Sequence, residues 1–496
     1  MKPVLKENTY RSGKIILSII FFSFQYFSPV YLYSQQIHSA GKDNKKDSTS
    51  ENTIYEEHLD SLNLKISDII ISGNDVTEKD VILREMKLTR GEIFSSKSCK
   101  EDKESIYRLG LFTNVEISPF LEKDSTILLH VNVGEKWYIF PIPQLTISDG
   151  DIRKISVGAN IHWANFRGRN ENLSLSFGIG YNAFVRAAYS IPWLGGDNLH
   201  MFTSISASYS IDRNRSFLAQ GQTNGSRIFG YRNSGFDYKN YTGKLIVGKF
   251  FERRFSIFAE GGYTFLRVTQ DSIGRTISPD GVDKYILAGF GLNFDSRDNR
   301  EYPMSGYFVH FNYEHFGLLD DNPVNFGRFT LEQRGYFPVV ITDNYSITLA
   351  SRVYTSVAIG PQIPIYNHQT LGFGEEYVRG WAIYGFEGEN ALTWYNEIRF
   401  PIIQPNSIKG QQIPIVRSLP YIKNFSYRYG LYLTAFYDAG GVWNGNEHLS
   451  DVPFMHGTGL GLNAILPFGM VGKLEYAFRF AHPTVGQFVI GLGSKF

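Results

Sequence analysis

The sequence predicts an all-β transmembrane barrel of about 16 antiparallel strands, preceded by one small α+β domain. Three observations favour this fold. Apolar and polar residues alternate along many segments after residue 137, glycine and aromatic residues are abundant (48 Gly, 39 Phe, 31 Tyr), and no stretch after residue 35 is apolar enough for a transmembrane helix. Strands that face lipid on one side and a polar lumen on the other show this pattern.

Composition excludes several other classes. Lys and Arg number 49 against 48 Asp and Glu, so the net charge of +1 creates no long-range field that would attract nucleic acid. The single cysteine, Cys99, has no partner for an internal disulfide and argues against a structural zinc site. The 11 histidines are scattered without metal-ligand spacing. We therefore predict no metal, no cofactor, no nucleic-acid partner and no catalytic residue.

The N-terminus is predicted to be a signal peptide over residues 1–34. Four basic residues (Lys2, Lys6, Arg11 and Lys14) precede an apolar run over 15–24, and Ser34 offers a small residue for cleavage before Gln35. The alternative is a transmembrane anchor, but the run falls short of the roughly 20 apolar residues that a helical span needs. Residues 35–63 are largely polar and are predicted to form a flexible linker.

Residues 64–136 are predicted to form the α+β domain, in the order β-α-α-β-β. "LKISDIIISGN" reads as a strand, and a helix is expected at "TEKDVILREM", where Thr77 and Asp80 have capping-box spacing. A second helix fits "KSCKEDKESIYRLGLF", with Gly110 as its C-terminal stop. "NVEISPF" and "STILLHVNVGE" complete the domain as two strands, the second with alternating apolar residues.

Residues 137–496 are predicted to form the barrel. "KISVGANIHW" is typical: Ile155, Val157 and every second residue after them are apolar or small, and the residues between them are polar or glycine. Sixteen such candidates occur, which leaves about 22 residues for each strand and its connection. A closed barrel leaves no backbone group unpaired in hydrocarbon. A soluble β-sandwich or propeller is the alternative, and it would have to bury the apolar face in protein.

A long connection at about 358–389, between the eleventh and twelfth candidate strands, carries Arg379. Its glycines permit tight turns and close backbone approach, which suits a loop folded into the lumen: Gly372, Gly374, Gly380, Gly385 and Gly388. Strand parity turns Glu397 and Asp438 toward the lumen, where their carboxylates could hold the arginine. The alternative is an exposed loop arginine.

The motifs together resemble the BamA/TamA-type outer-membrane barrels, a family that also includes two-partner secretion channels. The resemblance rests on "VRGW" (378–381), "FYDAGGVW" (436–443), "DSRDNREYPMSG" (295–306) and the terminal Phe496. It implies that Arg379, within Val378, Gly380 and Trp381, reaches Asp438 and Glu397. It also implies that Phe436, Gly440, Asp295, Arg297 and Asp298 are barrel-motif residues. Trp381 stands where Phe or Tyr is more usual.

The α+β domain likewise resembles a polypeptide-transport-associated (POTRA) repeat, through "ISGN", "RGEIFS", "RLGLFTNVEI" and "LLHVNVGE". The chain has room for one repeat, whereas the assembly branch of the family usually carries several. The resemblance implies a periplasmic domain that binds client or partner segments, partly by adding a strand to its sheet. The alternative is a spacer that binds nothing.

The resemblance implies a bacterial outer-membrane component that inserts membrane proteins or translocates polypeptides. Its expected partners are outer-membrane lipid, unfolded client polypeptides, and periplasmic proteins or lipoproteins bound through residues 64–136. A passive porin with an inward plug loop is the alternative function. A barrel hydrolase would need a nucleophile, a base and an acid brought together, and no such triad can be assigned.

We also expect a weak seam between the first and last barrel strands. Pro141 and Pro143 lie two residues apart, so the N–H groups that both lack would point to the same neighbouring strand. If that neighbour is the last strand, which ends near Phe496, fewer hydrogen bonds would close the barrel there.

Overall fold

The structure is a computed structural model. It describes residues 59–147, 155–194, 199–213, 237–251, 254–268, 276–318, 323–343, 345–372, 376–381, 385–418, 423, 426–466, 470–480 and 482–492. The predicted signal peptide, most of the predicted linker and Phe496 lie outside these residues.

The α+β domain has the predicted order of elements. Its three-stranded sheet is ordered β1-β3-β2, with β1 parallel and β2 antiparallel to β3. The inward face of β3 is fully buried and forms the centre of the core, through Ile127, Leu129, Val131 and Val133. The elements are β1 (Ile66–Ser72), α4 (Lys79–Leu83), α5 (Ser96–Arg108), β2 (Phe112–Leu121) and β3 (Ile127–Glu135).

Two local predictions for this domain were wrong. The predicted linker extends too far, because Leu59 is 1% exposed in the core and the Asp60 carboxylate accepts a hydrogen bond from the Ser96 backbone N–H (2.7 Å). Thr77 does not cap a helix: α4 begins after Glu78 and has no side-chain cap. The Thr77 hydroxyl instead donates to Glu135, which lies next to it only in the folded domain.

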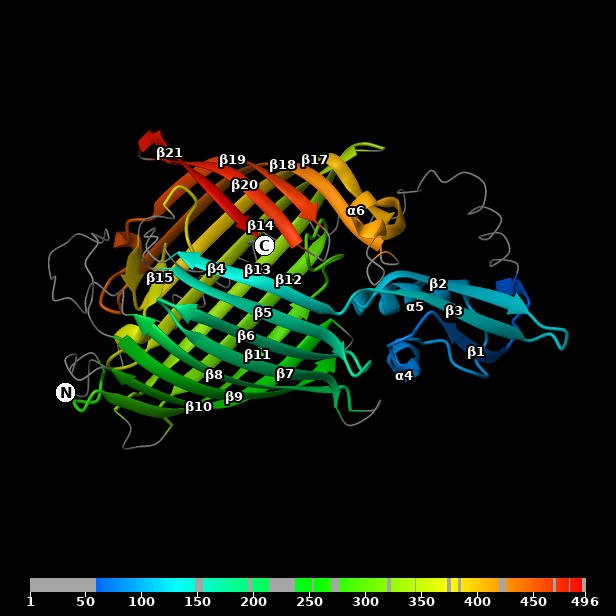
Figure 1. The fold of residues 1–496 in the computed structure, drawn as a ribbon, viewed down its shortest axis with the longest axis horizontal. Coiled ribbons are helices and arrows are strands. Elements are labelled where there is room, and N and C mark those ends of the chain that lie inside the picture. Colours follow the sequence, from blue (N-terminus) through cyan, green and yellow to red (C-terminus); the bar gives the residue numbers. More distant parts are fainter. Residues whose placement is uncertain are drawn as a thin grey trace.

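The barrel is a 16-stranded sheet in which each strand pairs antiparallel with its sequence neighbour. Figure 1 shows the sheet curled into a barrel, with its two edge strands, β4 and β21, on the side toward the viewer. The count and the order confirm the predicted fold. The strands are β4 (Ile139–Ile147), β5 (Ile155–Phe166), β6 (Glu171–Gly180), β7 (Phe184–Leu194), β8 (Met201–Arg213), β9 (Asp237–Phe251), β10 (Phe255–Val268), β11 (Val282–Asp295), β12 (Gly306–Phe316), β13 (Phe326–Thr342), β14 (Tyr345–Ile359), β17 (Asn390–Lys409), β18 (Ser426–Trp443), β19 (Met455–Leu466), β20 (Met470–Arg479) and β21 (His482–Leu492).

Apolar side chains cover the outside of the barrel. Ile179, Phe488 and Ile490 are 71%, 73% and 80% exposed, as expected for residues that contact lipid. The alternate residues on the same strands, such as Gly178 and Gln487, turn toward the lumen. Among the described residues, no helix is both long and apolar enough to cross a membrane.

The α+β domain lies at one end of the barrel, which we call the proximal end; the opposite end is the distal end (Figure 1). A buried polar contact joins the domain to the end of β5 and to the turn that follows it. Asn165 donates to the Thr77 hydroxyl (2.9 Å), and the Glu78 N–H donates to the Gly168 carbonyl (2.8 Å). The Tyr138 hydroxyl lies 3.1 Å from that of Thr77, and burial raises the pKa of the Tyr138 phenol, which stays neutral.

Short helices and a small hairpin occupy the longer connections. At the distal end, η5 (Ile365–Asn367) and the hairpin of β15 (Gln369–Leu371) and β16 (Phe386–Gly388) lie between β14 and β17. The distal connection between β18 and β19 contains η7 (Leu449–Asp451). At the proximal end, η6 (Gly410–Gln412) and α6 (Pro414–Arg417) follow β17.

Candidate functional site

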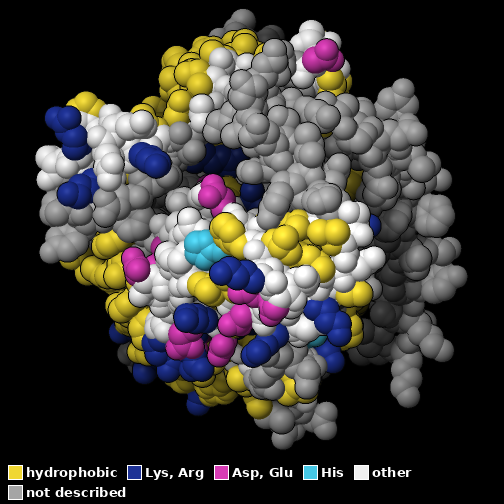
Figure 2. Space-filling view, turned by 90° about the vertical axis from the view of Figure 1, so that its right-hand side faces the viewer, with side chains coloured by type: hydrophobic (Ala, Val, Ile, Leu, Met, Phe, Trp, Pro, Cys, Tyr) yellow, Lys and Arg dark blue, Asp and Glu magenta, His cyan; other side chains and the backbone are white. Residues whose placement is uncertain are grey.

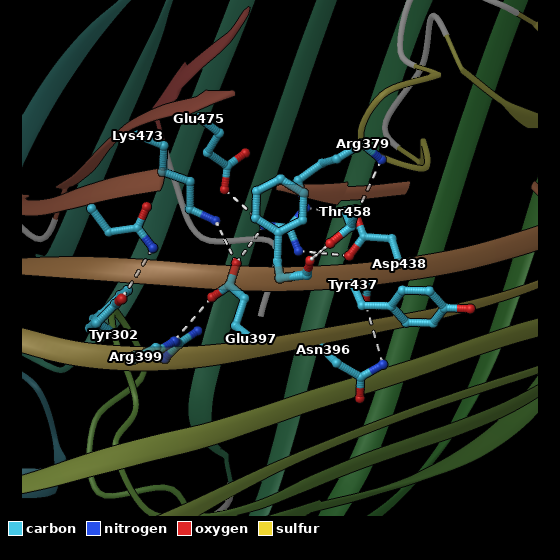
Figure 3. Close-up of polar contacts among 12 residues, drawn as sticks. Tyr302, Arg379, Asn396, Glu397, Arg399, Tyr437, Asp438, Thr458, Lys473 and Glu475 are labelled. Carbon is cyan, nitrogen blue, oxygen red and sulfur yellow. Dashed lines mark hydrogen bonds and ion pairs between the residues drawn. The ribbon is translucent and has the colours of Figure 1, made fainter. Parts of the chain in front are cut away.

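The segment that contains Arg379 lies in the long distal connection between β14 and β17, where the sequence predicts it. We call its described part, residues 376–381, the inward loop. Its side chains make polar contacts with lumen-facing residues of β14, β17, β18 and β20 and with a backbone carbonyl of β19. Figure 3 shows the contacts of Arg379. The loop therefore lies inside the barrel.

Arg379 is completely buried and is held by three carboxylates. Its Nε and Nη2 atoms donate to the two oxygens of Asp438, both at 2.7 Å, in a bidentate pair. Its Nη1 donates to Glu397 and to Glu475, both at 2.8 Å. The backbone N–H of Arg379 adds a further bond to Asp438 (3.1 Å). Strands β17, β18 and β20 thus converge on one loop side chain.

The buried charges around Arg379 balance. Arg399 donates from Nε to Glu397 (3.1 Å), and the Lys473 ammonium lies 3.9 Å from the same carboxylate. Three cations thereby face three carboxylates, which is the condition under which charges tolerate burial. The Phe436 ring lies beneath the Arg379 guanidinium, with its centroid 3.7 Å away, and adds a cation–π contact.

Glycines on the barrel wall make room for the loop backbone. A Cβ at Gly457 of β19 would overlap the carbonyl oxygen of Arg379, and one at Gly440 would lie 2.8 Å from the Val378 side chain. Gly380 has φ of +92°, in the left-handed region that other residues rarely adopt. These positions bring the loop against the wall more closely than a side chain would permit.

The residues beside Arg379 fasten the loop by other contacts. Trp381 donates its indole N–H to the His456 carbonyl (2.9 Å). Val378 is buried in an apolar cluster with Leu371, Phe386, Ala391, Val442 and Met455. All four residues of the Val-Arg-Gly-Trp motif therefore contact the barrel or adopt a conformation that the contact requires.

A second ion pair holds the loop three residues earlier. The Glu376 carboxylate accepts from Nη2 and Nη1 of Arg352 on β14, at 2.6 and 2.9 Å. Tyr395 on β17 donates its hydroxyl to the same carboxylate (2.9 Å). The loop thus contacts β14 and β17 through the Glu376 carboxylate, and β17, β18 and β20 through the Arg379 guanidinium. Neither Arg352 nor Glu376 was predicted from the sequence.

The "DSRDNREYPMSG" residues lie in the proximal β11–β12 turn, away from Arg379. Asp295 and Arg297 pair with each other (2.8 and 2.9 Å), and Asp298 accepts backbone N–H groups of its own turn. Their contacts stabilise the turn. Two residues of this segment reach the lumen cluster: the Tyr302 ring lies 4.2 Å from the Arg399 guanidinium, and the Pro303 carbonyl accepts from Arg399 (2.8 Å).

Pro141 and Pro143 lie on the edge strand β4, opposite Ile161 and Ala159 of β5. The Ala164 N–H donates to the carbonyl of Tyr138, which makes that opposed pair a hydrogen-bonded one. Because bonded and non-bonded pairs alternate, both prolines occupy non-bonded positions and direct their backbone nitrogens away from β5. These nitrogens face the open edge of the sheet.

Glu475 was missed at the sequence level, although a usable signal was present. On β20, Leu474 and Tyr476 face outward, so Lys473 and Glu475 face the lumen. The parity argument that selected Glu397 and Asp438 therefore selects Glu475 as well, once it is applied to this strand.

In the part of the chain that the structure describes, an α+β domain precedes a 16-stranded barrel whose inward loop is held by a buried arginine, and this arrangement defines a class of outer-membrane protein. Its fold is similar to that of BamA from Haemophilus ducreyi lacking POTRA domains 1–3, with a TM-score of 0.53 at 16% identity over 91% of this chain and 94% of that one. It is also similar to CdiB from Escherichia coli, with a TM-score of 0.54 at 14% identity over 87% and 75%.

Sequence profiles give the same result. The Omp85 superfamily domain matches residues 165–496, and a POTRA domain, described as a surface antigen variable number repeat, matches residues 64–136. The chain belongs to the Omp85 superfamily. It is accordingly an outer-membrane component for protein insertion or secretion, and its family consists of transport and assembly components.

Proposed function

We propose that this protein inserts client proteins into the outer membrane through the edge between β4 and β21, with its proximal end in the periplasm. The observation that carries the proposal is a contrast within the barrel. The inward loop forms buried ion pairs with several strands, including β14 and β18. By contrast, the described residues of β4 and β21 each pair with one neighbouring strand. A client strand could therefore pair at the edge without moving the loop.

The prolines of β4 support this route. With their nitrogens directed at the open edge, Pro141 and Pro143 remove two donors from any pairing between β4 and β21. Each missing hydrogen bond is worth about 0.5–1.5 kcal/mol. Gly491 on β21, around which a Cβ would meet nothing within 4 Å, adds little packing on the other side. A pair between β4 and β21 would thus be weaker than an ordinary strand pair.

Translocation through the lumen is the competing function. A polypeptide that took this path would have to displace the inward loop, and Arg379 would then leave its three buried carboxylates. Removing one partner from a buried ion pair costs about 3–5 kcal/mol. This cost favours the edge route.

The α+β domain would supply client or lipoprotein contacts. β2 is an edge strand of its sheet, and Phe120 and Leu121 near its end are each 51% exposed. Figure 2 looks at this end of the molecule and shows apolar side chains between charged ones on the domain surface. An extended peptide could add a strand at such an edge. Deleting residues 64–135 should then spare the barrel and abolish export.

A cross-link across the edge tests the proposal. Gln144→Cys on β4 would be combined in turn with Gln487→Cys, Val489→Cys and Gly491→Cys on β21, all in a Cys99→Ser background. Insertion of client barrels into vesicles or cells should stop when the disulfide forms and recover on reduction. Continued function of the cross-linked protein would reject the edge route and favour passage through the lumen.

Depletion followed by outer-membrane proteomics identifies the client class. Loss of many barrel proteins is the expected result. Loss of a single secreted protein, with the membrane proteome unchanged, would instead show dedicated translocation.

A further inference from the structure

One strand of the barrel holds two separate segments inside the lumen. The successive inward residues of β17 are Tyr395, Glu397 and Arg399, and each contacts a segment outside the strand. The first two hold the inward loop, which enters from the distal end. The third holds the β11–β12 turn, which enters from the proximal end.

The β11–β12 turn reaches Arg399 through two adjacent residues. The Arg399 Nη1 donates to the Pro303 carbonyl (2.8 Å), and the Tyr302 ring lies beneath the guanidinium. Tyr302 and Arg399 are both fully buried. The Tyr302 hydroxyl accepts from Asn463 of β19 (3.1 Å), and its ring packs against Tyr432 of β18. The turn thus reaches from its own strands to the wall formed by β17, β18 and β19.

Glu397 bonds to the inward loop through one oxygen and, through the other, to Arg399, which contacts the turn (Figure 3). Its Oε1 accepts from Arg379 of the inward loop (2.8 Å), and its Oε2 accepts from Arg399 (3.1 Å). Both contacts are buried, so bulk solvent does not screen either charge pair. A change in the position of Arg399 therefore alters the electrostatic environment of the carboxylate that holds Arg379.

We infer that Glu397 and Arg399 are positioning residues that couple the β11–β12 turn to the inward loop. Displacement of the turn at the proximal end frees Arg399 from Tyr302 and Pro303 and loosens the hold on Arg379. Release of Arg379 loosens the turn in the same way, because coupling between two sites is reciprocal. A polypeptide that reaches the proximal mouth thereby affects the loop without touching it. This coupling holds for either route of export.

Labelling of single cysteines tests the coupling in the full-length protein, in a Cys99→Ser background. Val378→Cys reports on the inward loop and Met304→Cys on the turn, each through its rate of reaction with a small maleimide. Tyr302→Ala, which removes the ring beneath Arg399, should accelerate both reporters several-fold. Arg379→Ala should likewise accelerate the turn reporter.

Two matched variants separate coupling from general loosening. Tyr302→Phe keeps the ring and loses only the hydroxyl bond to Asn463, so the loop reporter should react nearly as in the parent protein. Arg300→Gln changes an exposed charge in the same turn and should leave both rates unchanged. Heat-modifiable migration on a gel verifies that each barrel is folded. If the Tyr302→Ala barrel does not fold, Tyr302→Leu is measured in its place.

The inference is overturned if loss of the Tyr302 ring accelerates the turn reporter alone. It is also overturned if Arg379→Ala accelerates the loop reporter alone. Equal acceleration of both reporters by Arg300→Gln would show nonspecific loosening and would overturn it as well.

Discussion

Two walls of the barrel lumen show how one strand pattern serves two purposes. The wall formed by β17–β20 directs buried charges inward, including Glu397, Asp438 and Glu475. The wall formed by β5–β8 mostly directs small residues inward, such as Ser174 and Ser206, which are half-buried. On both walls the apolar residues between these positions face outward, so the two walls present the same kind of surface to lipid.

The difference lies in what satisfies the inward polar groups. Hydroxyls of the β5–β8 wall bond to each other, as between Ser190 and Ser204 (2.9 Å), or face the lumen. The carboxylates of the β17–β20 wall are almost fully buried, and a buried carboxylate is costly without a cationic partner. The inward loop supplies that partner. The position of the charges on the wall therefore decides where the loop binds.

We expect the largest effect from removing the cation of the inward loop, Arg379. Arg379→Ala leaves three buried carboxylates facing only Lys473 and Arg399, and the loss of one partner of a buried ion pair costs about 3–5 kcal/mol. We expect a folded barrel with a released loop and impaired export. Protease access to the loop, together with heat-modifiable gel migration, measures this.

Arg186→Ala on the β5–β8 wall is the matched control for that experiment, since Arg186 is exposed and lies in the region without the loop. It should leave the loop protected. If Arg379→Ala retained full activity and unchanged protease access, the buried cluster would not hold the loop.

A steric test follows, with a somewhat smaller effect. Gly457→Val places a side chain where the Arg379 carbonyl lies, so the loop must shift while every charge remains. We expect faster maleimide labelling of Val378→Cys in the Cys99→Ser background. Gly243→Ala on β9 is the control, because a Cβ there meets nothing within 4 Å. Equal labelling in both variants would mean that the loop does not require the glycine.

The second anchor should matter less than Arg379. Glu376→Gln removes the ion pair with Arg352 but keeps an acceptor for Tyr395, and hydrogen bonds to charged groups are worth about 1.5–3 kcal/mol. Protease access should rise to an intermediate level. In the double variant with Arg352→Gln, the effects should be less than additive, because the two residues share one interaction. Fully additive effects would show that they act separately.

The smallest effect is expected at the α+β domain. Asn165→Ala at the end of β5 removes the bond to Thr77 and costs about 1–3 kcal/mol, since it leaves a buried hydroxyl with fewer partners. The domain should move more freely relative to the barrel. Double electron–electron resonance between a spin label on each of them measures this as a broader distance distribution. Labelling of the loop reporter should not change. A change at the loop would show that the two contacts are not independent.

Alternation along the strands was enough to predict the barrel, its 16 strands and the inward direction of Glu397 and Asp438, because a period of two assigns each residue to one face. Contacts between remote segments depended on tertiary structure. Spacing favoured Thr77 as a helix cap, but its hydroxyl instead donates a hydrogen bond to Glu135, 58 residues away. Arg352 pairs with Glu376 because the inward loop folds into the curled sheet. Tyr302 contacts Arg399 because the β11–β12 turn does so from the other end. No local pattern records these paths, since each is set by burial and charge balance over the whole barrel.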